Sequence, residues 1–132
     1  MAAEKRVEKR QSKRAFFKLK EGIAAKVANF GNVEEFVPVT LLSISSGGIS
    51  FTGNKYKLRG IKEDDRLTLR EIHTPQPLGL IDRAEVVVKY VMDDEYSIRL
   101  IIGCKITEMS KTSSKKIPTF VKDRLYKVGF DA

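Results

Sequence analysis

From Phe16 onward the chain repeats one pattern, in which short segments rich in apolar and β-branched residues are separated by turn residues. Alternation of apolar and polar side chains over about four to eight residues is typical of a half-buried β-strand. Short strands at such regular spacing predict an all-β fold, a small antiparallel barrel or sandwich of about six strands. The strand segments are 16–20, 23–30, 34–44, 49–53, 66–72, 81–92 and 96–107.

The residues between these segments are turn formers, and they set the expected pairing of the strands. Gly31-Asn32 is a hairpin signal, and Asp93-Asp94-Glu95 separates two long segments that we expect to pair as a hairpin. Pro38 interrupts its segment and favours a sheet edge or a bulge there, because proline cannot donate to a strand ladder. In the segment 66–72, strict alternation would place Glu71 on the face of the two leucines.

The C-terminal part changes from a period of two to a helical period. We predict a helix that begins near Pro118, a favoured first helical residue, and ends at Gly129. Its apolar face would pack on the barrel or against a second copy, so we expect a monomer or a weak homodimer. That face consists of Ile117, Phe120, Val121, Leu125 and Val128.

The positive charge of the chain is concentrated at its two ends. The formal net charge is +8 over 132 residues. Residues 1–20 hold eight Lys/Arg and two Glu, a net of +6, and residues 111–132 have a net of +4, which leaves −2 between them. A nucleic-acid-binding domain would be expected to have a uniformly basic body, whereas the body of this chain is slightly acidic. This distribution indicates an anionic partner held at one edge, or two solvated tails; a barrel that binds nucleic acid through its basic ends is a third interpretation.

The residues that support catalysis or metal binding are scarce. Cys104 is the only cysteine, which excludes an internal disulfide and a cysteine-based zinc site, and His73 is the only histidine. No nucleotide-binding glycine loop, nucleophile motif or paired-cysteine motif is present, so we expect neither an enzyme nor a metal site. The first residues contain no apolar stretch of the kind a signal peptide needs, and no segment is apolar enough to span a bilayer. A cytoplasmic protein is expected.

Two short motifs remain as candidates for binding. Arg10 and Arg14 stand four residues apart, and arginine forks suit both phosphates and the O6/N7 edge of guanine. Ser43, Ser45 and Gly48 follow at the end of a strand segment, where glycine permits a positive φ and close backbone approach. Taken singly, the first motif is also compatible with a solvated arm, and the second with a plain tight turn.

Taken in order, the two motifs resemble those of the PilZ domain family, R-x-x-x-R followed by [D/N]-x-S-x-x-G. Arg14 lies just ahead of Phe16, which sets the register and makes Arg10 the first arginine rather than Arg6. The segment 83–109 resembles the family's closing hairpin. The resemblance covers most of residues 8–110. It implies three parts, which are a flexible basic arm (1–14), a PilZ-like barrel (15–110) and a C-terminal linker and helix (111–132).

The resemblance implies a sensor of the second messenger cyclic di-GMP that changes conformation on binding and signals to a protein partner not identifiable from the sequence. By carry-over, Arg10 and Arg14 would bind phosphates and guanine edges, with Ser45 and Gly48 around a guanine. Ser43 departs from the family pattern, which has Asp or Asn at that position. Losing one good polar contact costs roughly 1–3 kcal/mol, or about one to two powers of ten in affinity. A PilZ-type adaptor that binds no ligand is therefore the alternative.

Overall fold

The computed structural model describes residues 13–29 and 35–131, without the side chains of 126–131. Arg10 and the predicted Gly31-Asn32 turn lie outside the described residues. The strands are β1 (Ala15–Phe16), β2 (Ala24–Asn29), β3 (Val37–Ile44), β4 (Gly48–Asn54), β5 (Arg66–His73), β6 (Leu80–Asp93) and β7 (Arg99–Met109). The helices are the 3-10 turn η1 (Leu19–Glu21), the short α2 (Lys55–Leu58) and the long α3 (Lys111–Asp131).

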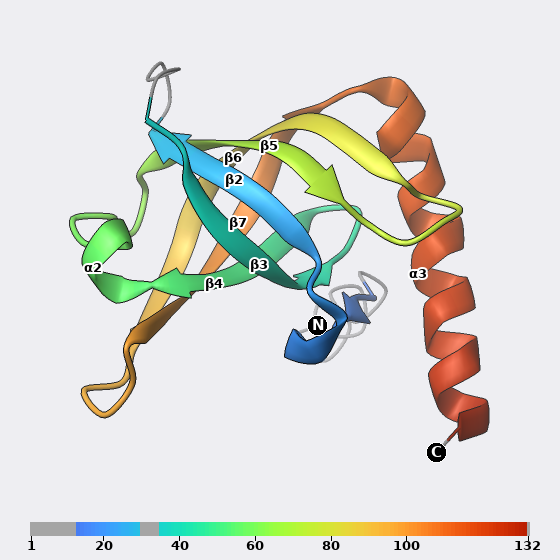
Figure 1. The fold of residues 1–132 in the computed structure, drawn as a ribbon. Coiled ribbons are helices and arrows are strands. Elements are labelled where there is room, and N and C mark those ends of the chain that lie inside the picture. Colours follow the sequence, from blue (N-terminus) through green and yellow to red (C-terminus); the bar gives the residue numbers. More distant parts are fainter. Residues whose placement is uncertain (1–12, 30–34, 132) are drawn as a thin grey trace, which may run out of the picture.

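Six of the strands close into an antiparallel barrel. They are hydrogen-bonded in the order β3-β2-β5-β6-β7-β4, and β4 pairs back with β3 to complete the ring. The short β1 is added outside the ring, antiparallel to the end of β3. Figure 1 shows the barrel with the β6–β7 hairpin extending from one end and α3 standing beside it. The prediction of a six-stranded antiparallel barrel with a C-terminal helix is confirmed.

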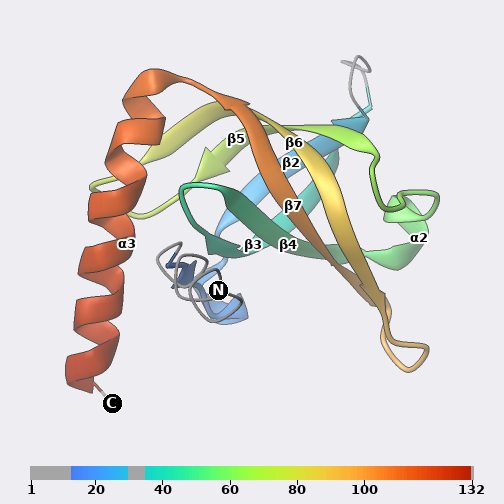
Figure 2. The same cartoon turned by 180° about the vertical axis from the view of Figure 1, so that it is seen from behind.

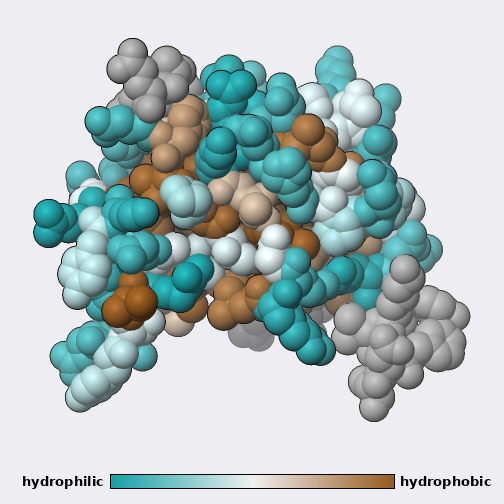
Figure 3. Space-filling view, viewed as in Figure 1, coloured by the Kyte–Doolittle hydropathy of each residue, from teal (hydrophilic) through white to brown (hydrophobic). Residues whose placement is uncertain are grey.

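Apolar side chains from alternate strand positions fill the inside of the barrel. Leu67 and Leu69 of β5 are fully buried, as the alternation predicts. The prediction that Glu71 shares their face is wrong, because Glu71 has a φ of 52° and interrupts the alternation without changing the register of β5 and β6. After this residue the phase of the strand changes, so that Ile72 is buried and Glu71 pairs with Lys26 on the surface. Outside, the face in Figure 3 has apolar groups between hydrophilic ones.

The segment 16–20 is a strand only at its beginning. β1 ends at Phe16, and residues 19–21 form a 3-10 turn instead of the predicted strand. The Glu21 side chain accepts a hydrogen bond from the Lys18 backbone nitrogen at 2.6 Å, and Gly22 ends the turn with a φ of 60°. A local cap of this kind competes with strand pairing for the same backbone groups.

Pro38 occupies a position where β3 is paired on one side only. It lies opposite Lys26 of β2, while the pairing of β3 with β4 begins at Thr40. This agrees with the expectation of an edge-like position, because the missing N–H interrupts no ladder on the β4 side. The bulge in β3 lies further along, at Leu42, between the paired residues Leu41 and Ser43.

The C-terminal helix α3 begins earlier and ends later than predicted. The Ser110 hydroxyl accepts from the Ser113 backbone nitrogen at 3.2 Å, so Ser110 caps a helix that begins at Lys111. Pro118 therefore lies inside the helix, and the helix continues through Gly129 to Asp131. The helix therefore continues through Pro118, although proline in the interior removes one hydrogen bond and crowds the preceding turn.

The apolar face of α3 packs on the barrel, which is the first of the two arrangements expected from the sequence. Ile117, Phe120 and Val121 are buried, and the rings of Phe17 and Phe120 lie 6.1 Å apart. Arg124 stacks over the Phe17 ring, 4.8 Å from its centre, and forms an ion pair with Glu21. Figure 2 shows the helix along one side of the molecule, and the helix contacts β1. No helix within the described residues is long and apolar enough to cross a membrane.

Candidate functional site

The turn between β3 and β4 is built around the hydroxyl of Ser45. This oxygen accepts hydrogen bonds from the backbone nitrogens of Gly47 at 3.3 Å and Gly48 at 3.0 Å. The Ser45 backbone nitrogen donates to the Gly48 carbonyl at 2.8 Å, and the Gly47 carbonyl accepts from Ile106 of β7. Ser45 is buried, so its hydroxyl holds the turn together rather than projecting from it.

Gly48 allows a close approach of other groups to the backbone. A Cβ atom at this position would lie 2.9 Å from Arg14 Nη2 and 3.0 Å from the Cys104 carbonyl oxygen. A Cβ atom at Gly47 would have no neighbouring atom within 4 Å. The expectation that these glycines use a positive φ is wrong, because the positive-φ glycines of the described residues are at other positions. What matters at Gly48 is the absence of a side chain.

Ser43 lies next to this turn, under the side chain of Arg14. Its hydroxyl oxygen accepts from Arg14 Nη1 at 3.3 Å and lies 2.6 Å from the hydroxyl oxygen of Ser50. Both serines are buried. Sequence reasoning missed Ser50, although pairing the two strands across the turn would have placed it opposite Ser43.

Arg14 is positioned by the residues that follow it. Ala15 and Phe16 pair with Ile44 and Ser43 of β3, and the fully buried Ala15 anchors this short strand. The Arg14 side chain is therefore directed over the turn, and we call Arg14, Ser43, Ser45 and Gly48 together the motif corner. Of the predicted site residues, these four lie together, and Arg10 lies outside the described residues.

The motif corner carries uncompensated positive charge. Arg14 has no carboxylate partner among the described residues, and Lys105 lies opposite Gly48 on β7 with its side chain exposed. Lys13 is also exposed. A guanidinium with most of its donors unused, next to two further cations, favours an anionic ligand.

The outer wall beside the motif corner continues in a transverse row of residues across four strands. Ser43 pairs with Ser50, Ser50 with Gly103, and Gly103 with Tyr90. The Tyr90 ring covers Gly103, where a Cβ would lie 2.1 Å from Tyr90 Cε2, and Tyr90 remains 44% exposed. Tyr90 offers an aromatic surface that sequence reasoning missed, since only the register of β6 and β7 places it there.

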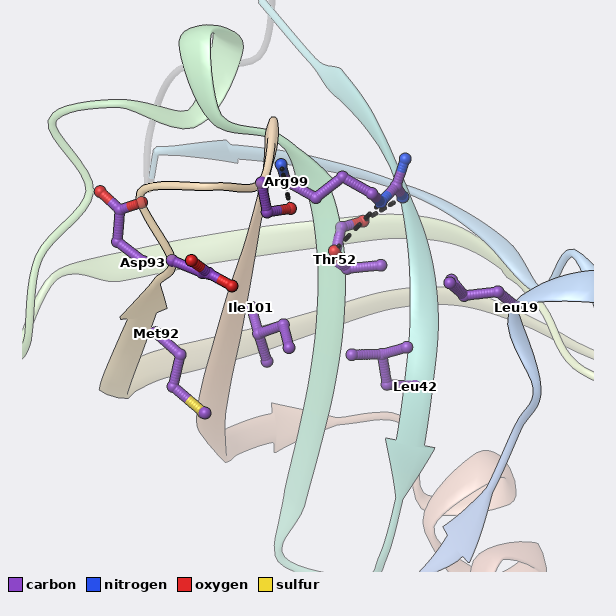
Figure 4. Close-up of a pocket in the computed structure, with 9 residues that line it drawn as sticks. Leu19, Leu42, Thr52, Met92, Asp93, Arg99 and Ile101 are labelled. Atoms are coloured by element: carbon purple, nitrogen blue, oxygen red, sulfur yellow. Dashed lines mark hydrogen bonds between the residues drawn. The ribbon is translucent and has the colours of Figure 1, made fainter.

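The neighbouring row lines a hollow beside the corner, which we call the groove. Thr52, Ile101 and Met92 follow one another across β4, β7 and β6. With Leu19, Leu42, Arg99 and the acidic residues at the hairpin end, they enclose about 540 Å³. Figure 4 shows Arg99 extended across Thr52, with Leu42 and Ile101 projecting from the strands on either side of β4.

The other reactive side chains give no sign of catalysis. Cys104 is buried, and its burial raises the pKa of the thiol from 9.0 to about 12, so the thiolate is scarce at neutral pH. His73 is exposed at the end of β5. Within residues 13–29 and 35–131, no group of three His, Cys, Asp or Glu side chains could hold a metal ion.

Comparison with known proteins identifies the fold. No protein-family model matches the chain, and no relative was found among curated proteins. Among solved structures, the PilZ domain of YcgR from Escherichia coli with c-di-GMP aligns at a TM-score of 0.63 and 12% identity, over 87% of this chain and 90% of that one. The chain has the fold of a PilZ domain.

Two longer proteins align with this PilZ-type barrel over only part of their length. The inhibitor of motility MotI/DgrA from Bacillus subtilis has a TM-score of 0.67 and 17% identity over 87% of this chain. The MrkH–c-di-GMP complex from K. pneumonia has a TM-score of 0.65 and 17% identity over 90%. The PilZ-type chain spans about half of each, 50% and 53% respectively.

Proposed function

We propose that the chain is a receptor for cyclic di-GMP, and not an enzyme, with Arg10, Arg14, Ser43, Ser45 and Gly48 at its binding site. The observation that carries this proposal is the position of Arg14. Its guanidinium lies on Ser43 and against Gly48, without a carboxylate partner among the described residues. Cyclic di-GMP has two phosphates and two guanines, and an arginine fork can bind either group. Two of the structural neighbours are complexes with c-di-GMP, which supports the same ligand.

Each residue of the motif corner has a distinct task in this proposal. Arg14 exchanges its long 3.3 Å hydrogen bond to Ser43 for stronger contacts with a phosphate or a guanine edge. Ser45 acts through the turn that it holds, by presenting the backbone of Gly47 and Gly48 to the ligand. Gly48 keeps the approach open.

The signalling step is the recruitment of the N-terminal segment to the barrel. A dianion bound at Arg14 would attract Arg10 to the same corner and so cover part of the outer wall with residues 1–14. A protein partner would respond to the changed surface, in control of motility, exopolysaccharide synthesis or attachment in the cytoplasm of a bacterium. Ligand-driven ordering of a segment is a common way to switch such a surface.

Titration calorimetry with cyclic di-GMP tests the proposal. We expect wild type to bind and Arg14→Ala or Arg10→Ala to weaken binding by about tenfold to a hundredfold, the value of a charge-assisted contact. Arg59→Ala is the matched control, because Arg59 is an exposed arginine at the end of α2, away from the corner. A wild type that gives no heat at high ligand concentration overturns the proposal, as does equal binding by the Arg14 and Arg59 variants.

One observation favours the alternative, an adaptor that acts through protein contacts without the ligand. Ser43 is short, buried and already bonded to Ser50, so it cannot offer the planar acceptor of Asp or Asn. Ser43→Asp separates the two functions. Under the receptor proposal, the new carboxylate beside Arg14 restores an acceptor for a guanine edge and tightens binding. An equal absence of binding before and after the substitution would favour the adaptor.

A further inference from the structure

We propose that the groove is a second guanine subsite, which holds the guanine of the bound cyclic dinucleotide that does not contact the motif corner. This inference rests on the proposed function, and it assigns ligand contacts to residues outside both sequence motifs. It depends on three features of the groove, namely its distance from the corner, its apolar floor and the polar groups at its edges.

The groove lies directly beside the motif corner on the same outer wall. Along β4 and β7, Thr52 and Ile101 follow Ser50 and Gly103 by two residues each. Two residues of an antiparallel strand span roughly 7 Å, so the groove row and the corner row are neighbours on one surface. A ligand with two bases can therefore contact both rows without a change in the barrel.

The floor of the groove suits the flat face of a base. Leu42 and Ile101 are partly buried and Met92 is 57% exposed, so apolar surface that no described residue covers lies at the bottom of the groove. The volume of about 540 Å³ falls within the range of about 300–1,000 Å³ that is usual for small-molecule sites. Sites of that kind combine an apolar lining with a few polar groups that fix the orientation of the ligand.

Arg99 supplies the hydrogen-bond donors at one edge of the groove. Its Nε donates to the Thr52 hydroxyl at 3.3 Å and its Nη2 to the Thr52 carbonyl at 3.4 Å. These bonds hold the guanidinium along the groove and leave Nη1 without a partner among the described residues. The Nη1 N–H groups and the second N–H of Nη2 then form one edge, which matches the O6 and N7 acceptors of guanine.

Two carboxylates supply acceptors at the other edge. Asp93 Oδ1 accepts from Lys55 at 2.9 Å, and Asp94 Oδ1 accepts from the Tyr96 backbone nitrogen at 2.9 Å, so each retains its second oxygen. Guanine carries an amino group at C2, where adenine has none, and a carboxylate is a natural acceptor for it. The same charges would repel a phosphate. The edges of the groove therefore favour a guanine base over a phosphate group.

The experiment compares two ligands across three proteins by titration calorimetry. The ligands are cyclic di-GMP and its inosine analogue, which lacks both exocyclic amino groups. The proteins are wild type, the double variant Asp93→Asn/Asp94→Asn and the matched control Glu63→Gln/Asp64→Asn, which removes two adjacent carboxylates that do not line the groove. We expect the groove variant to bind cyclic di-GMP about tenfold more weakly than wild type and to lose much less for the inosine analogue.

The outcomes separate this inference from the receptor proposal. Removing negative charge should by itself tighten the binding of a dianion, so the control variant should bind as wild type or slightly better. Unchanged or tighter binding of cyclic di-GMP by the groove variant overturns the second subsite and leaves the role of Arg14 intact. Equal losses for both ligands also overturn it. Arg99→Ala, with a melting curve to check folding, should weaken binding by a similar factor. Absence of binding by wild type overturns the receptor proposal itself.

Discussion

Substitution of Gly48 should weaken ligand binding strongly while changing the stability of the fold only slightly. A methyl group at this position would lie 2.9 Å from Arg14 Nη2 and 3.0 Å from the Cys104 carbonyl, where ordinary contacts begin at about 3.4 Å. The arginine is the end of a long side chain and can move away, whereas the carbonyl belongs to β7 and can give way by only a few tenths of an ångström. Gly48→Ala should therefore displace the guanidinium at a modest cost in stability.

The magnitude follows from two opposing effects. Overpacking lowers the free energy of unfolding by about 1–3 kcal/mol. Alanine restricts the unfolded chain more than glycine does, which raises that free energy by about 0.4–1 kcal/mol. We therefore expect a net loss of stability of about 1 kcal/mol. Displacement of Arg14 should weaken cyclic di-GMP binding by about tenfold or more. Denaturant unfolding and titration calorimetry on the same samples measure both quantities.

Gly47→Ala is the matched control for this prediction. It makes the same chemical change one residue earlier, at a point with nothing within 4 Å and without a positive φ. We expect it to bind cyclic di-GMP as wild type does, with unchanged or slightly raised stability. If the two alanine variants bind equally well, the contact between Arg14 and the Gly48 backbone has no part in binding.

Three further predictions concern stability and reactivity. Burial raises the pKa of Glu21, but hydrogen bonds and charges from Arg124 and Lys18 outweigh it, so the pKa lies below 4.5. The ion pair should stabilise the fold above pH 4.5, and this stability should be lost as the pH falls through the lowered pKa. In acid unfolding, Glu21→Gln should therefore lose less stability than wild type over that pH range. Phe120→Ala should cost about 3–5 kcal/mol in denaturant unfolding, because it empties the contact between α3 and the barrel; a loss below 1 kcal/mol would mean that the helix is not docked in solution. Cys104 should resist alkylation at pH 8 until the protein unfolds, and rapid labelling of the native protein would contradict its burial and raised pKa.

The barrel could be predicted from the sequence because its strands follow simple alternation. The β6–β7 hairpin lies where its apolar segments and its acidic turn placed it, and the apolar face of α3 contains the buried Ile117 and Phe120. The errors lie where a local hydrogen bond outweighs the pattern. The Glu21 cap replaces a strand, and the Ser110 cap moves the start of α3 away from Pro118.

Only those residues of the candidate site that lie within short sequence motifs could be predicted. The two motifs name Arg14, Ser43, Ser45 and Gly48 because these residues lie close together in short stretches of sequence. Tyr90 and Arg99 come from strands far along the chain, and only the register of the closed barrel brings them to the same wall. Register depends on bulges, such as those at Leu42 and between Val88 and Tyr90, that alternation does not reveal.

Closure of the ring with only six strands has a consequence for how such a chain can diversify. So narrow a barrel has its inside occupied by packed side chains, which leaves ligands the exterior alone. Inward and outward residues alternate along each strand, so one set determines folding and the other determines what is recognised. Substitutions on the outer wall can thus alter ligand choice while the interior, and with it the architecture, stays the same.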